Sequence, residues 1–434
     1  MDILTQVRNA GIVGAGGAGF PTYVKLAAKV DIIIANGMEC EPLLYVDQHM
    51  MAAHADKVVD GLRLAMEATG ARYCFITLKK HYKDAITALN AVIGGDTGIT
   101  LHRSETYYPA GDERQIIFEI TGKVVPTAGL PLDVGVVVLN IGTLAAISDA
   151  KNGIPVTERF VTVGGAVRNP VTLNVPIGMS FSELIECAGG VTEECWYIEG
   201  GPLMGKVYTS IYGVVSKTTN GIIALPVKHP LLAQKTGGLN LQLIKSVCCQ
   251  CTMCTQLCPR NSLGLGTSPH KAMLSFAYGT DLVPDRNSII SCCDCGICSY
   301  YACNFGLKPA MVMGILKGKM GEAGIKPDAK MPGRLDAALY SKRIPTTRMI
   351  SRTGLTKYNV PAKLMDELPD VKEVNIPLLQ HIGAPSVPVV SHGQKVNKGD
   401  LIADIPEGKL GAKIHASISG TVKITMEDSI GIEV

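Results

Sequence analysis

Two short cysteine runs constrain the fold of this chain more than any other feature. The runs are CCQCTMCTQLCPR, which begins at residue 248, and CCDCGICSYYACN, which begins at residue 292. Their spacings are C-x2-C-x2-C-x3-C and C-x2-C-x2-C-x4-C, set by Cys248, Cys251, Cys254 and Cys258 in the first run and Cys292, Cys295, Cys298 and Cys303 in the second. Thiolates at this spacing wrap three corners of an iron–sulfur cubane and leave the fourth corner to a distant cysteine. The runs therefore predict two [4Fe–4S] clusters in one compact, helical, ferredoxin-like domain.

Zinc sites and disulfides are the alternatives for such cysteines. Zinc sites more often use two CxxC pairs separated by about a dozen residues or more, and disulfides are unusual in a cytoplasmic protein. In the bacterial ferredoxin pattern, the last cysteine of each run binds the other cluster. This pattern predicts one cluster on Cys248, Cys251, Cys254 and Cys303, and the other on Cys292, Cys295, Cys298 and Cys258.

Some details of the two runs stay open. Cys249 and Cys293 are the second members of CC doublets and break the spacing, so we expect neither to be a ligand. The second run has one extra residue before Cys303 and no proline after it, which leaves the geometry of Cys303 open. Two adjacent clusters conduct electrons rather than catalyse a reaction, so another group must supply the electrons.

Composition excludes several classes of partner. The chain has 434 residues, enough for roughly two to four domains. Its net charge of +3 and its 5% of aromatic residues give no basis for binding nucleic acid. The longest apolar run, between Asp133 and Asp149, is shorter than the roughly 18 to 20 residues that span a bilayer. The first residues, MDILTQVRN, match no signal or transit peptide, so we expect a cytoplasmic protein without a transmembrane segment.

The stretch GAGGAGFPT, residues 14–22, is a candidate phosphate-binding loop. Gly14, Gly16 and Gly19 satisfy G-x-G-x-x-G, but a helix-like segment precedes them and Pro21 follows, unlike the strand–loop–helix of a Rossmann fold. A loop without a ligand is the alternative. The small residues nevertheless leave backbone N–H groups bare, as an anion cradle requires.

Polar residues follow two buried strands in the same region. Residues 30–35 and VGVVVLN at 134–140 are continuous apolar runs, typical of parallel strands. The first strand is followed by Asn36, Glu39 and Glu41, and the second by Asn140 and by Thr143, which is expected to open a helix. A loop-to-helix junction in YYPAGDERQII adds Gly111, Asp112 and Glu113. Each has an ordinary alternative as a helix cap or a surface charge. Ligands of open α/β sheets gather at the carboxyl ends of strands, so together these groups favour a phosphate-bearing cofactor.

Several motifs resemble known electron-transfer families. GAGGAGFPTYVK, NGMECEP, YPAGDER and NIGTLAAI, in that order, resemble the flavin- and NADH-binding subunit of respiratory complex I and, more closely, the C subunit of the Rnf complex. GGPLMG, the cysteine runs, PLLQHIGAPSVPVV and HASISGTV extend the resemblance over almost the whole chain. In the Rnf protein the QHIGAP segment stands at the N-terminus, whereas here it lies in the last part of the chain. That order is most similar to the cobalamin reductases of propanediol-utilisation microcompartments.

The resemblance implies an FMN site with NADH as substrate. The residues that would hold the phosphate and ribityl groups or donate hydrogen bonds are Gly14, Gly16, Gly17, Gly19, Lys25, Asn36, Tyr108, Gly111, Asn140 and Thr143. The residues on the side where NADH stacks would be Phe20, Glu39, Glu41 and Glu113. One position departs from the complex I pattern NADEGEP: Met38 replaces the Asp and is a poor hydrogen-bond partner for a ribityl hydroxyl. Cys40 replaces a Gly and is expected to pack as a small apolar residue.

These observations predict an α/β multidomain chain. The expected domains are an FMN/NADH-binding complex-I-like α/β domain at 1–152, a soluble-ligand-binding β-grasp (SLBB) domain at 153–240 and a dicluster domain at 241–320. A connector of helix and loop at 321–370 and a C-terminal barrel-sandwich hybrid at 371–434 follow. The last domain is similar to lipoyl domains, but Lys409 and Lys413 lack the usual neighbours of a lipoylated lysine.

The resemblance implies an oxidoreductase that passes electrons from NADH through FMN and both clusters to an acceptor. The preferred acceptor is cob(III/II)alamin on a corrinoid adenosyltransferase, in the cytoplasm or inside a bacterial microcompartment. One alternative is an Rnf-like module that feeds ferredoxin, a membrane partner or an amino-acid reductase. Another is a non-enzymatic iron–sulfur scaffold whose flavin site has decayed. A homo-oligomer is compatible with the sequence.

Overall fold

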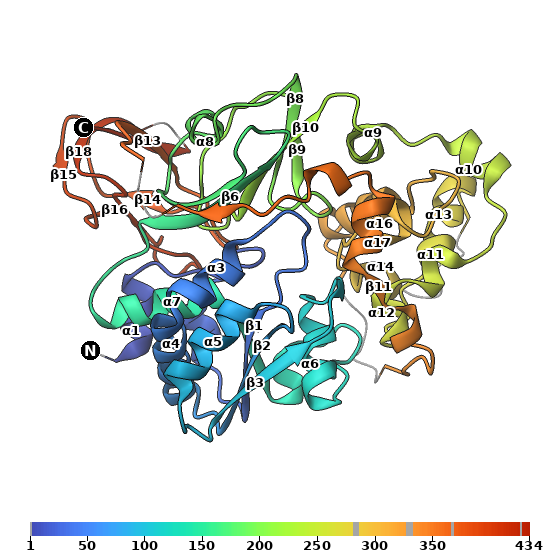
Figure 1. Cartoon of the computed structure of the whole chain (residues 1–434), viewed down its shortest axis with the longest axis horizontal. Coiled ribbons are helices and arrows are strands. Elements are labelled where there is room, and N and C mark those ends of the chain that lie inside the picture. Colours follow the sequence, from blue (N-terminus) through green and yellow to red (C-terminus); the bar gives the residue numbers. More distant parts are fainter. Residues whose placement is uncertain (1, 281–285, 327–332, 366–368, 426–427) are drawn as a thin grey trace.

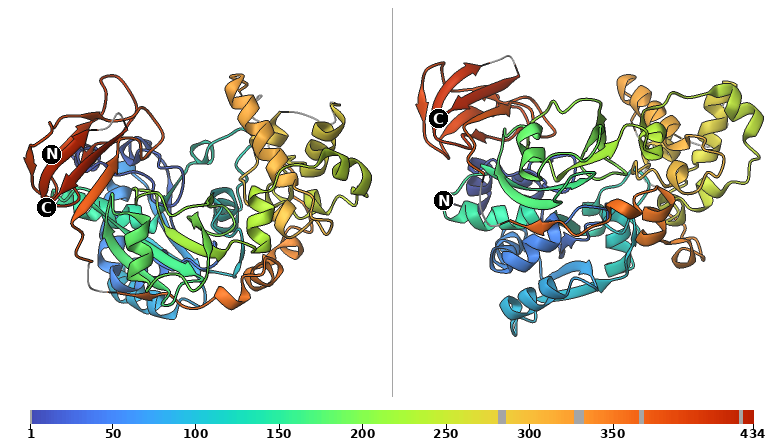
Figure 2. Two further views of the ribbon diagram at one scale, coloured as in Figure 1. Left: turned by 90° about the horizontal axis from the view of Figure 1, so that it is seen from above. Right: turned by 45° about the horizontal axis from the view of Figure 1, so that its top comes forward.

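The computed structural model describes residues 2–280, 286–326, 333–365, 369–425 and 428–434. Figure 1 shows a C-terminal β-sandwich at one end and a lobe of short helices at the other, with an α/β unit and a β-sheet unit between them. The sandwich and the helical lobe stay apart in both further views (Figure 2).

The α/β unit is built on a four-stranded parallel sheet in the order β3-β2-β1-β5. On β1, Ile33 packs into the core beneath α4 and α7, whereas Ile34 packs on the opposite face with α6. A sheet covered on both faces requires continuous apolar strands, which is why the two apolar runs form β1 and β5. The elements of this unit are α1 (Ile3–Asn9), α2 (Thr22–Leu26), β1 (Ile32–Gly37), α3 (Val46–Ala53), α4 (Ala55–Thr69), β2 (Tyr73–Lys79), α5 (Lys83–Ile93), β3 (Ile99–Ser104), β4 (Tyr107–Tyr108), α6 (Glu113–Thr121), η1 (Pro131–Val134), β5 (Val136–Asn140) and α7 (Ile141–Lys151).

The glycine loop lies between two helices, so the prediction that it is not an ordinary Rossmann loop is confirmed. The Asp2 carboxylate caps α1 by accepting from the Thr5 N–H at 2.8 Å, and α2 begins directly after Pro21. The prediction that Thr143 opens the helix after β5 is wrong. Asn140 caps α7 by accepting from the Gly142 N–H at 2.8 Å, so the helix begins at Ile141 and not at Thr143.

The β-sheet unit has six strands in the order β12-β7-β6-β10-β8-β9. The strands β6, β7, β8 and β10 and the helix α8 form the β-grasp module expected in this region. Ser180 and Glu183 form a capping box at the start of α8. The elements of this unit are β6 (Glu158–Gly165), β7 (Val171–Pro176), α8 (Phe181–Cys187), β8 (Cys195–Glu199), β9 (Lys206–Tyr208), β10 (Gly221–Pro226) and α9 (Pro230–Thr236).

The helical lobe contains both cysteine runs. Its helices are short except for the pair α13 and α16, whose side chains Met273 and Val312 share one core. The elements are α10 (Leu241–Val247), α11 (Met253–Gln256), α12 (Pro259–Ser262), α13 (Pro269–Tyr278), α14 (Asn287–Ile290), α15 (Ile297–Tyr300) and α16 (Pro309–Glu322).

The predicted connector contains two short strands as well as helix and loop, and residues 327–332 and 366–368 of it lie outside the described part of the chain. β11 pairs with β4 of the α/β unit, and β12 pairs with β7 of the β-sheet unit. The Arg343 guanidinium donates to the Glu119 carboxylate at 2.8 Å, which fixes β11 further. The elements are η2 (Tyr340–Lys342), β11 (Ile344–Pro345), α17 (Thr346–Arg352), η3 (Thr356–Tyr358) and β12 (Lys363–Leu364).

The C-terminal sandwich consists of a sheet β13-β19-β18-β15 and a sheet β14-β16-β17. Its strands are β13 (Glu373–Pro377), β14 (Val387–Pro388), β15 (Lys395–Val396), β16 (Leu401–Asp404), β17 (Ile414–His415), β18 (Gly420–Thr425) and β19 (Ser429–Glu433). The domain boundaries given above stay predictions.

The sandwich packs behind the glycine loop. The Ile382 N–H donates to the Gly19 carbonyl at 3.2 Å. Lys217 of the β-sheet unit is 2% exposed, and its ammonium donates to the carbonyls of Gly11 at 2.7 Å and Lys413 at 2.6 Å. Burial lowers the pKa of Lys217 to about 7. This one side chain therefore joins three units at the back of the loop.

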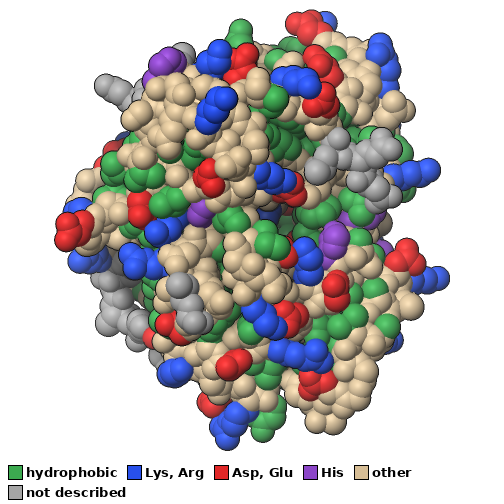
Figure 3. Space-filling view, turned by 90° about the vertical axis from the view of Figure 1, so that its left-hand side faces the viewer, with side chains coloured by type: hydrophobic (Ala, Val, Ile, Leu, Met, Phe, Trp, Pro, Cys, Tyr) green, Lys and Arg blue, Asp and Glu red, His purple; other side chains and the backbone are tan. Residues whose placement is uncertain are grey.

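The face at the sandwich end carries charges of both signs, interspersed with hydrophobic side chains (Figure 3). None of the helices in the described part of the chain is both long and apolar enough to cross a bilayer.

Candidate functional site

A cavity of about 190 Å³, here called the central cavity, reaches from the glycine loop to the second cysteine run. Six of the predicted cofactor residues line it: Gly16, Asn36, Glu39, Glu41, Gly111 and Asn140. The other lining residues are Met38, Cys40, Leu44, Asp47, Pro109, Asp112, Met204, Asn220, Cys293 and Cys295. The carboxyl ends of β1 and β5 thus share one space with a predicted cluster ligand.

Hydrogen bonds from two other elements hold the glycine loop in place. The Ala15 N–H donates to Thr143 Oγ1 at 3.0 Å, and the Ala15 carbonyl accepts from the Arg159 guanidinium at 2.7 Å. A Cβ at Gly16 would lie 2.8 Å from Asn140 Nδ2, so this position requires glycine. Gly16 and Gly17 remain exposed, which leaves backbone available to a ligand.

The remaining predicted cofactor residues do not line the central cavity: Gly14, Gly17, Gly19, Phe20, Lys25, Tyr108, Glu113 and Thr143. The Lys25 ammonium lies 3.7 Å from the Glu113 carboxylate and donates to the Val138 carbonyl at 3.3 Å. Gly19, with φ of +71°, packs against Gln380 and His381 of the sandwich. The binding roles of these residues stay predictions.

Two carboxylates lie together on one wall of the cavity. Glu39 is 8% exposed; one oxygen accepts from the Val46 N–H at 2.9 Å, and the other has no partner among the described residues. Asp47 accepts from Asn140 Nδ2 at 3.2 Å. Burial, and then the charge of Asp47, raises the pKa of Glu39 to about 8, and burial raises the pKa of Asp47 to about 6. Lys79 is buried beside them.

Tyr108 connects another carboxylate to the second cysteine run. Its hydroxyl lies 3.0 Å from Glu41 and 2.8 Å from the Cys295 carbonyl. One hydroxyl donates a single hydrogen. The Tyr108 hydroxyl therefore donates to the Glu41 carboxylate or to the Cys295 carbonyl, and burial raises the pKa of Glu41. The Glu41 carboxyl group also accepts from the Leu203 N–H at 2.8 Å.

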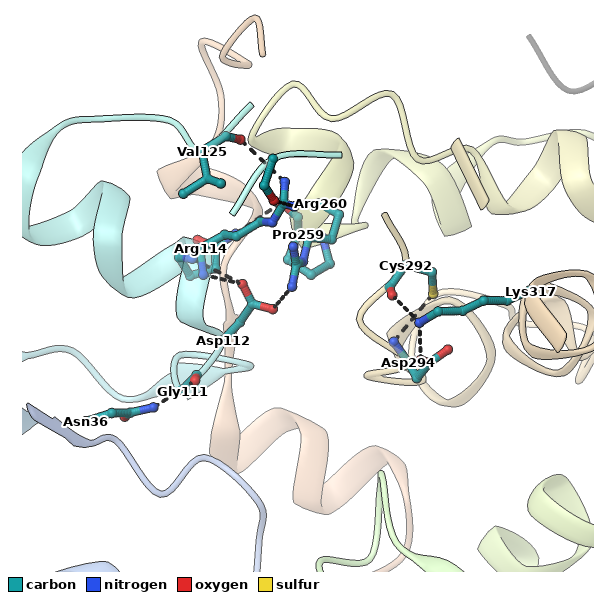
Figure 4. A network of polar contacts seen from close by, with 12 residues as sticks. Asn36, Gly111, Asp112, Arg114, Val125, Pro259, Arg260, Cys292, Asp294 and Lys317 are labelled. Carbon is teal, nitrogen blue, oxygen red and sulfur yellow. Dashed lines mark hydrogen bonds and ion pairs between the residues drawn. The ribbon is translucent and has the colours of Figure 1, made fainter. Parts of the chain in front are cut away.

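An ion pair clamps the α/β unit onto the helical lobe (Figure 4). Arg260 follows the first cysteine run and donates to Asp112 at 2.6 Å; their side chains are 13% and 6% exposed. The other oxygen of Asp112 caps α6 by accepting from the Arg114 N–H at 3.0 Å. Gln115 donates to the Pro259 carbonyl at 3.0 Å. The wall between cavity and lobe is therefore held by charge and by hydrogen bonds.

The two cysteine runs repeat one backbone shape. Gln250 and Asp294 are the third residues of their runs, and both have positive φ, at 53° and 57°. Thr252 and Gly296 are the fifth residues, with φ of 59° and 74°. Left-handed backbone is rare outside glycine, so its recurrence at the same places marks two equivalent loops. Lys317 also donates to the Cys292 carbonyl at 2.9 Å (Figure 4).

The thiols of the two cysteine runs interact with one another across the runs as well as within them. Burial, and then the thiols of Cys303, Cys251 and Cys248, raises the pKa of Cys254 to about 12. Burial, and then Cys292, Cys258 and Cys254, raises the pKa of Cys298. No three His, Cys, Asp or Glu side chains among the described residues converge on one metal ion. A cubane does not need such convergence, because each thiolate binds its own iron, so the thiols fit two clusters.

Several residues of the site carry no sequence signal that we used. Asp47 and Arg159 lie in regular elements without a motif, and Cys293, expected to be a spectator, lines the cavity and interacts with Cys295 and Arg260. Lys79 ends β2 next to β1, so its position at a strand end, like that of Asn36, is a signal that could have found it.

Met38, which replaces the Asp of the complex I pattern, is 2% exposed and packs in the core with Ile34. Burial raises the pKa of Cys40 to about 12, which disfavours its thiolate form.

The central cavity fits a phosphate-bearing flavin in its donor set. It offers exposed glycine backbone at Gly16, a close approach at Gly111, where a Cβ would lie 2.6 Å from the Met38 carbonyl, and an unpartnered oxygen of Glu39.

Four family models match the chain: the Nuo51 FMN-binding domain at 7–149, the SLBB domain at 160–207, the 4Fe-4S dicluster domain at 247–308 and the RnfC barrel sandwich hybrid domain at 355–430. The predicted α/β multidomain fold, FMN and two clusters are confirmed.

Three relatives set the family. The chain is 41% identical to the cobalamin reductase PduS of Salmonella typhimurium over 436 residues, which cover 99% of this chain and 96% of that protein. PduS of Citrobacter freundii matches to the same degree, 41% over 435 residues. The C subunit of the Na(+)-translocating ferredoxin:NAD(+) oxidoreductase complex of Acetobacterium woodii is 41% identical over 264 residues, 59% of this chain and 57% of that protein. The chain, which matches PduS from end to end, belongs to the family of the cobalamin reductase PduS.

Proposed function

We propose that this chain is an NADH-dependent flavo-iron–sulfur reductase that passes electrons through FMN and two [4Fe–4S] clusters to cob(III/II)alamin. One observation carries the proposal: Gly16 of the glycine loop and Cys295 of the second cysteine run line the same cavity. A flavin held there would contact the residues around one cluster without an intervening domain.

FMN, when bound, supplies the chemistry that accepts a hydride and releases single electrons. The chain supplies position and environment. Gly16 and Gly17 would present their bare backbone to the flavin, and Asn36 and Asn140 would orient it from the strand ends. Glu39, whose pKa burial raises to about 8, would hold a proton at neutral pH beside Asp47, whose pKa is raised only to about 6. The clamp between Asp112 and Arg260 keeps the cavity closed toward the helical lobe.

The cofactor residues outside the cavity lining belong to this proposal through the family resemblance. Lys25 would pair with the phosphate in place of Glu113, and Phe20 and Glu113 would border the nicotinamide. Gly14, Gly19, Tyr108 and Thr143 would act by shaping the loop and the cavity floor, as their contacts favour. The cluster ligands would follow the crossed pattern predicted from the sequence.

The acceptor is the finer part of the proposal. It rests on the match to a cobalamin reductase over nearly the whole chain, whereas the match to the Acetobacterium woodii oxidoreductase spans 59% of it. A corrinoid adenosyltransferase as partner and a place inside a bacterial microcompartment follow from the same resemblance. The Rnf-like module and the iron–sulfur scaffold remain the competing functions.

Anaerobic absorbance of the reconstituted protein tests all three functions. We expect flavin bands that bleach with NADH, followed by loss of cluster absorbance, and then formation of cob(II)alamin from added cob(III)alamin. Bleaching without corrinoid reduction would favour the Rnf-like module. No flavin, or no response to NADH, would favour the scaffold.

A further inference from the structure

A second hollow lies beside the first cysteine run. This outer hollow has a volume of about 420 Å³ and is lined by Met253, Leu257, Tyr301, Ala302, Asn304, Arg348, Ser351 and Arg352. A neighbouring hollow of about 200 Å³ shares Asn304 and Arg352 with it and is lined by Cys303 itself. The Arg352 guanidinium donates to Asn304 Oδ1 at 2.9 Å and forms the ridge between the two.

The outer hollow has an apolar floor and a cationic rim. Arg348 and Arg352 are exposed on α17. Among the described residues that line either hollow, none is Asp or Glu. Met253 is 38% exposed, beside the half-buried Leu257. An apolar centre with a charged rim is typical of protein interfaces, and rim charges steer a partner of opposite sign.

The hollow is next to the cluster that solvent approaches most closely. Ala302 on its floor packs in one buried group with Cys254 and with Cys298 of the other predicted ligand set, and Cys303 lines the neighbouring hollow. Cys251 of the same predicted ligand set is exposed, whereas Cys295 and Cys298 of the other set are buried. An electron that leaves by this cluster therefore has the shortest protein path to a partner in the outer hollow.

The arginines stand on a fixed support. α17 follows β11 directly, and β11 pairs with β4 of the α/β unit. The Arg343 guanidinium lies 4.1 Å from the centre of the Tyr107 ring and pairs with Glu119. A preorganised charged surface loses less entropy when it binds.

We propose that the outer hollow is the docking site for the acidic face of a redox partner protein. The inference rests on the proposed function, since the first-run cluster must carry electrons. Each NADH yields NAD⁺, one proton and two electrons, so two partner molecules are each reduced by one electron.

The test uses the holoprotein and two oxidised protein probes, acidic plastocyanin and basic cytochrome c. Binding is measured by calorimetry without NADH at low and high salt, and reduction of each probe is then followed with NADH. The variant is Arg348→Glu with Arg352→Glu. The matched control is Lys83→Glu with Arg103→Glu, on α5 and β3 away from α17 (Figure 1).

We expect plastocyanin to bind the variant at least about tenfold more weakly than the control, with a smaller salt dependence, and cytochrome c to bind it more tightly. NADH should still bleach the flavin of the variant. Equal plastocyanin binding by variant and control overturns the proposal, as does displacement of plastocyanin by millimolar phosphate in both proteins. If NADH reduces no cluster, the proposed function fails, while the binding comparison still decides the docking surface.

Discussion

The central cavity and the outer hollow are lined by opposite charges, and only the outer hollow also touches the first cysteine run. Glu39, Glu41, Asp47 and Asp112 line the central cavity, and none of the described residues around it is Lys or Arg. The outer hollow has two arginines and, among its described lining, no carboxylate. Burial differs too: Glu39 is buried, whereas both arginines are exposed.

This difference separates two uses of charge. Burial disfavours ionised carboxylates, so the pKa values of Glu39, Glu41 and Asp47 are all raised, that of Glu39 to about 8. The remaining carboxylate, Asp112, is paired with Arg260. Exposed arginines keep their charge and act at a distance through water. The inner site is therefore suited to holding protons, and the outer site to attracting a partner.

The largest effect is expected from Cys295→Ala, which removes a predicted cluster ligand that lines the central cavity. We expect loss of about half of the bound iron, because a cubane rarely survives the loss of one thiolate. Flavin should still bleach with NADH, but the remaining cluster should stay oxidised. Iron analysis and electron paramagnetic resonance measure this, with Cys249→Ala as the control that keeps all iron. Equal iron in both variants would mean that Cys295 is not a cluster ligand.

Asp112→Ala tests the clamp between the cavity and the lobe. It leaves Arg260 as a buried unpaired charge and removes the cap of α6, so we expect about 3–5 kcal/mol of destabilisation. Denaturant unfolding measures it. Asp112→Asn retains the capping oxygen and loses only the charge, so its stability should lie between that of the Ala variant and that of the unchanged protein. A cost below about 1 kcal/mol for the Ala variant would mean that Arg260 finds solvent.

Glu39→Gln tests whether the inner charges are held as protons. The pKa of Glu39 is about 8 in the folded chain against an ordinary 4.5. Between these values only the folded chain holds the proton, so stability falls as pH rises from 4.5 to 8, with a slope of about 1.4 kcal/mol per pH step of one. Thermal unfolding across this range should show a flatter slope for Glu39→Gln. Arg103→Glu, an exposed change, should leave the slope unaltered.

The smallest effect is expected from the two equivalent loops of the cysteine runs. Thr252→Gly removes a β-branched residue from a left-handed backbone position, which relieves strain in the folded chain. Glycine's greater freedom in the unfolded chain offsets this stabilisation, so the free energy of unfolding should change by no more than about 1 kcal/mol. Gly296→Thr has the same backbone shape, but its Cβ would lie 2.2 Å from the Tyr300 ring and should destabilise clearly more. Equal costs for the two variants, in thermal melts, would mean that the loops are not distinguished by packing.

The sequence predicts those parts of the molecule that follow from local pattern. Continuous apolar runs predict β1 and β5, and thiol spacing predicts the two clusters. β11 and β12 have two residues each, too few for any period, and form only because distant strands offer edges. Asp47 and Arg159 reach the site through tertiary packing, which spacing along the chain does not encode. The cap of α7 was misplaced because both Asn140 and Thr143 are good capping residues.

The contact behind the glycine loop has a consequence for how such chains are rearranged. Lys217 and Gly19 bind the sandwich to the region that holds the first helix, and both chain ends lie on the same side of the molecule, one above the other (Figure 1). A chain that began with the sandwich could enter α1 through a linker long enough to join these two ends, and it would keep every one of these bonds. The fold then does not depend on the order of the segments along the chain. A circular permutant whose chain begins at β13 should therefore adopt the same fold.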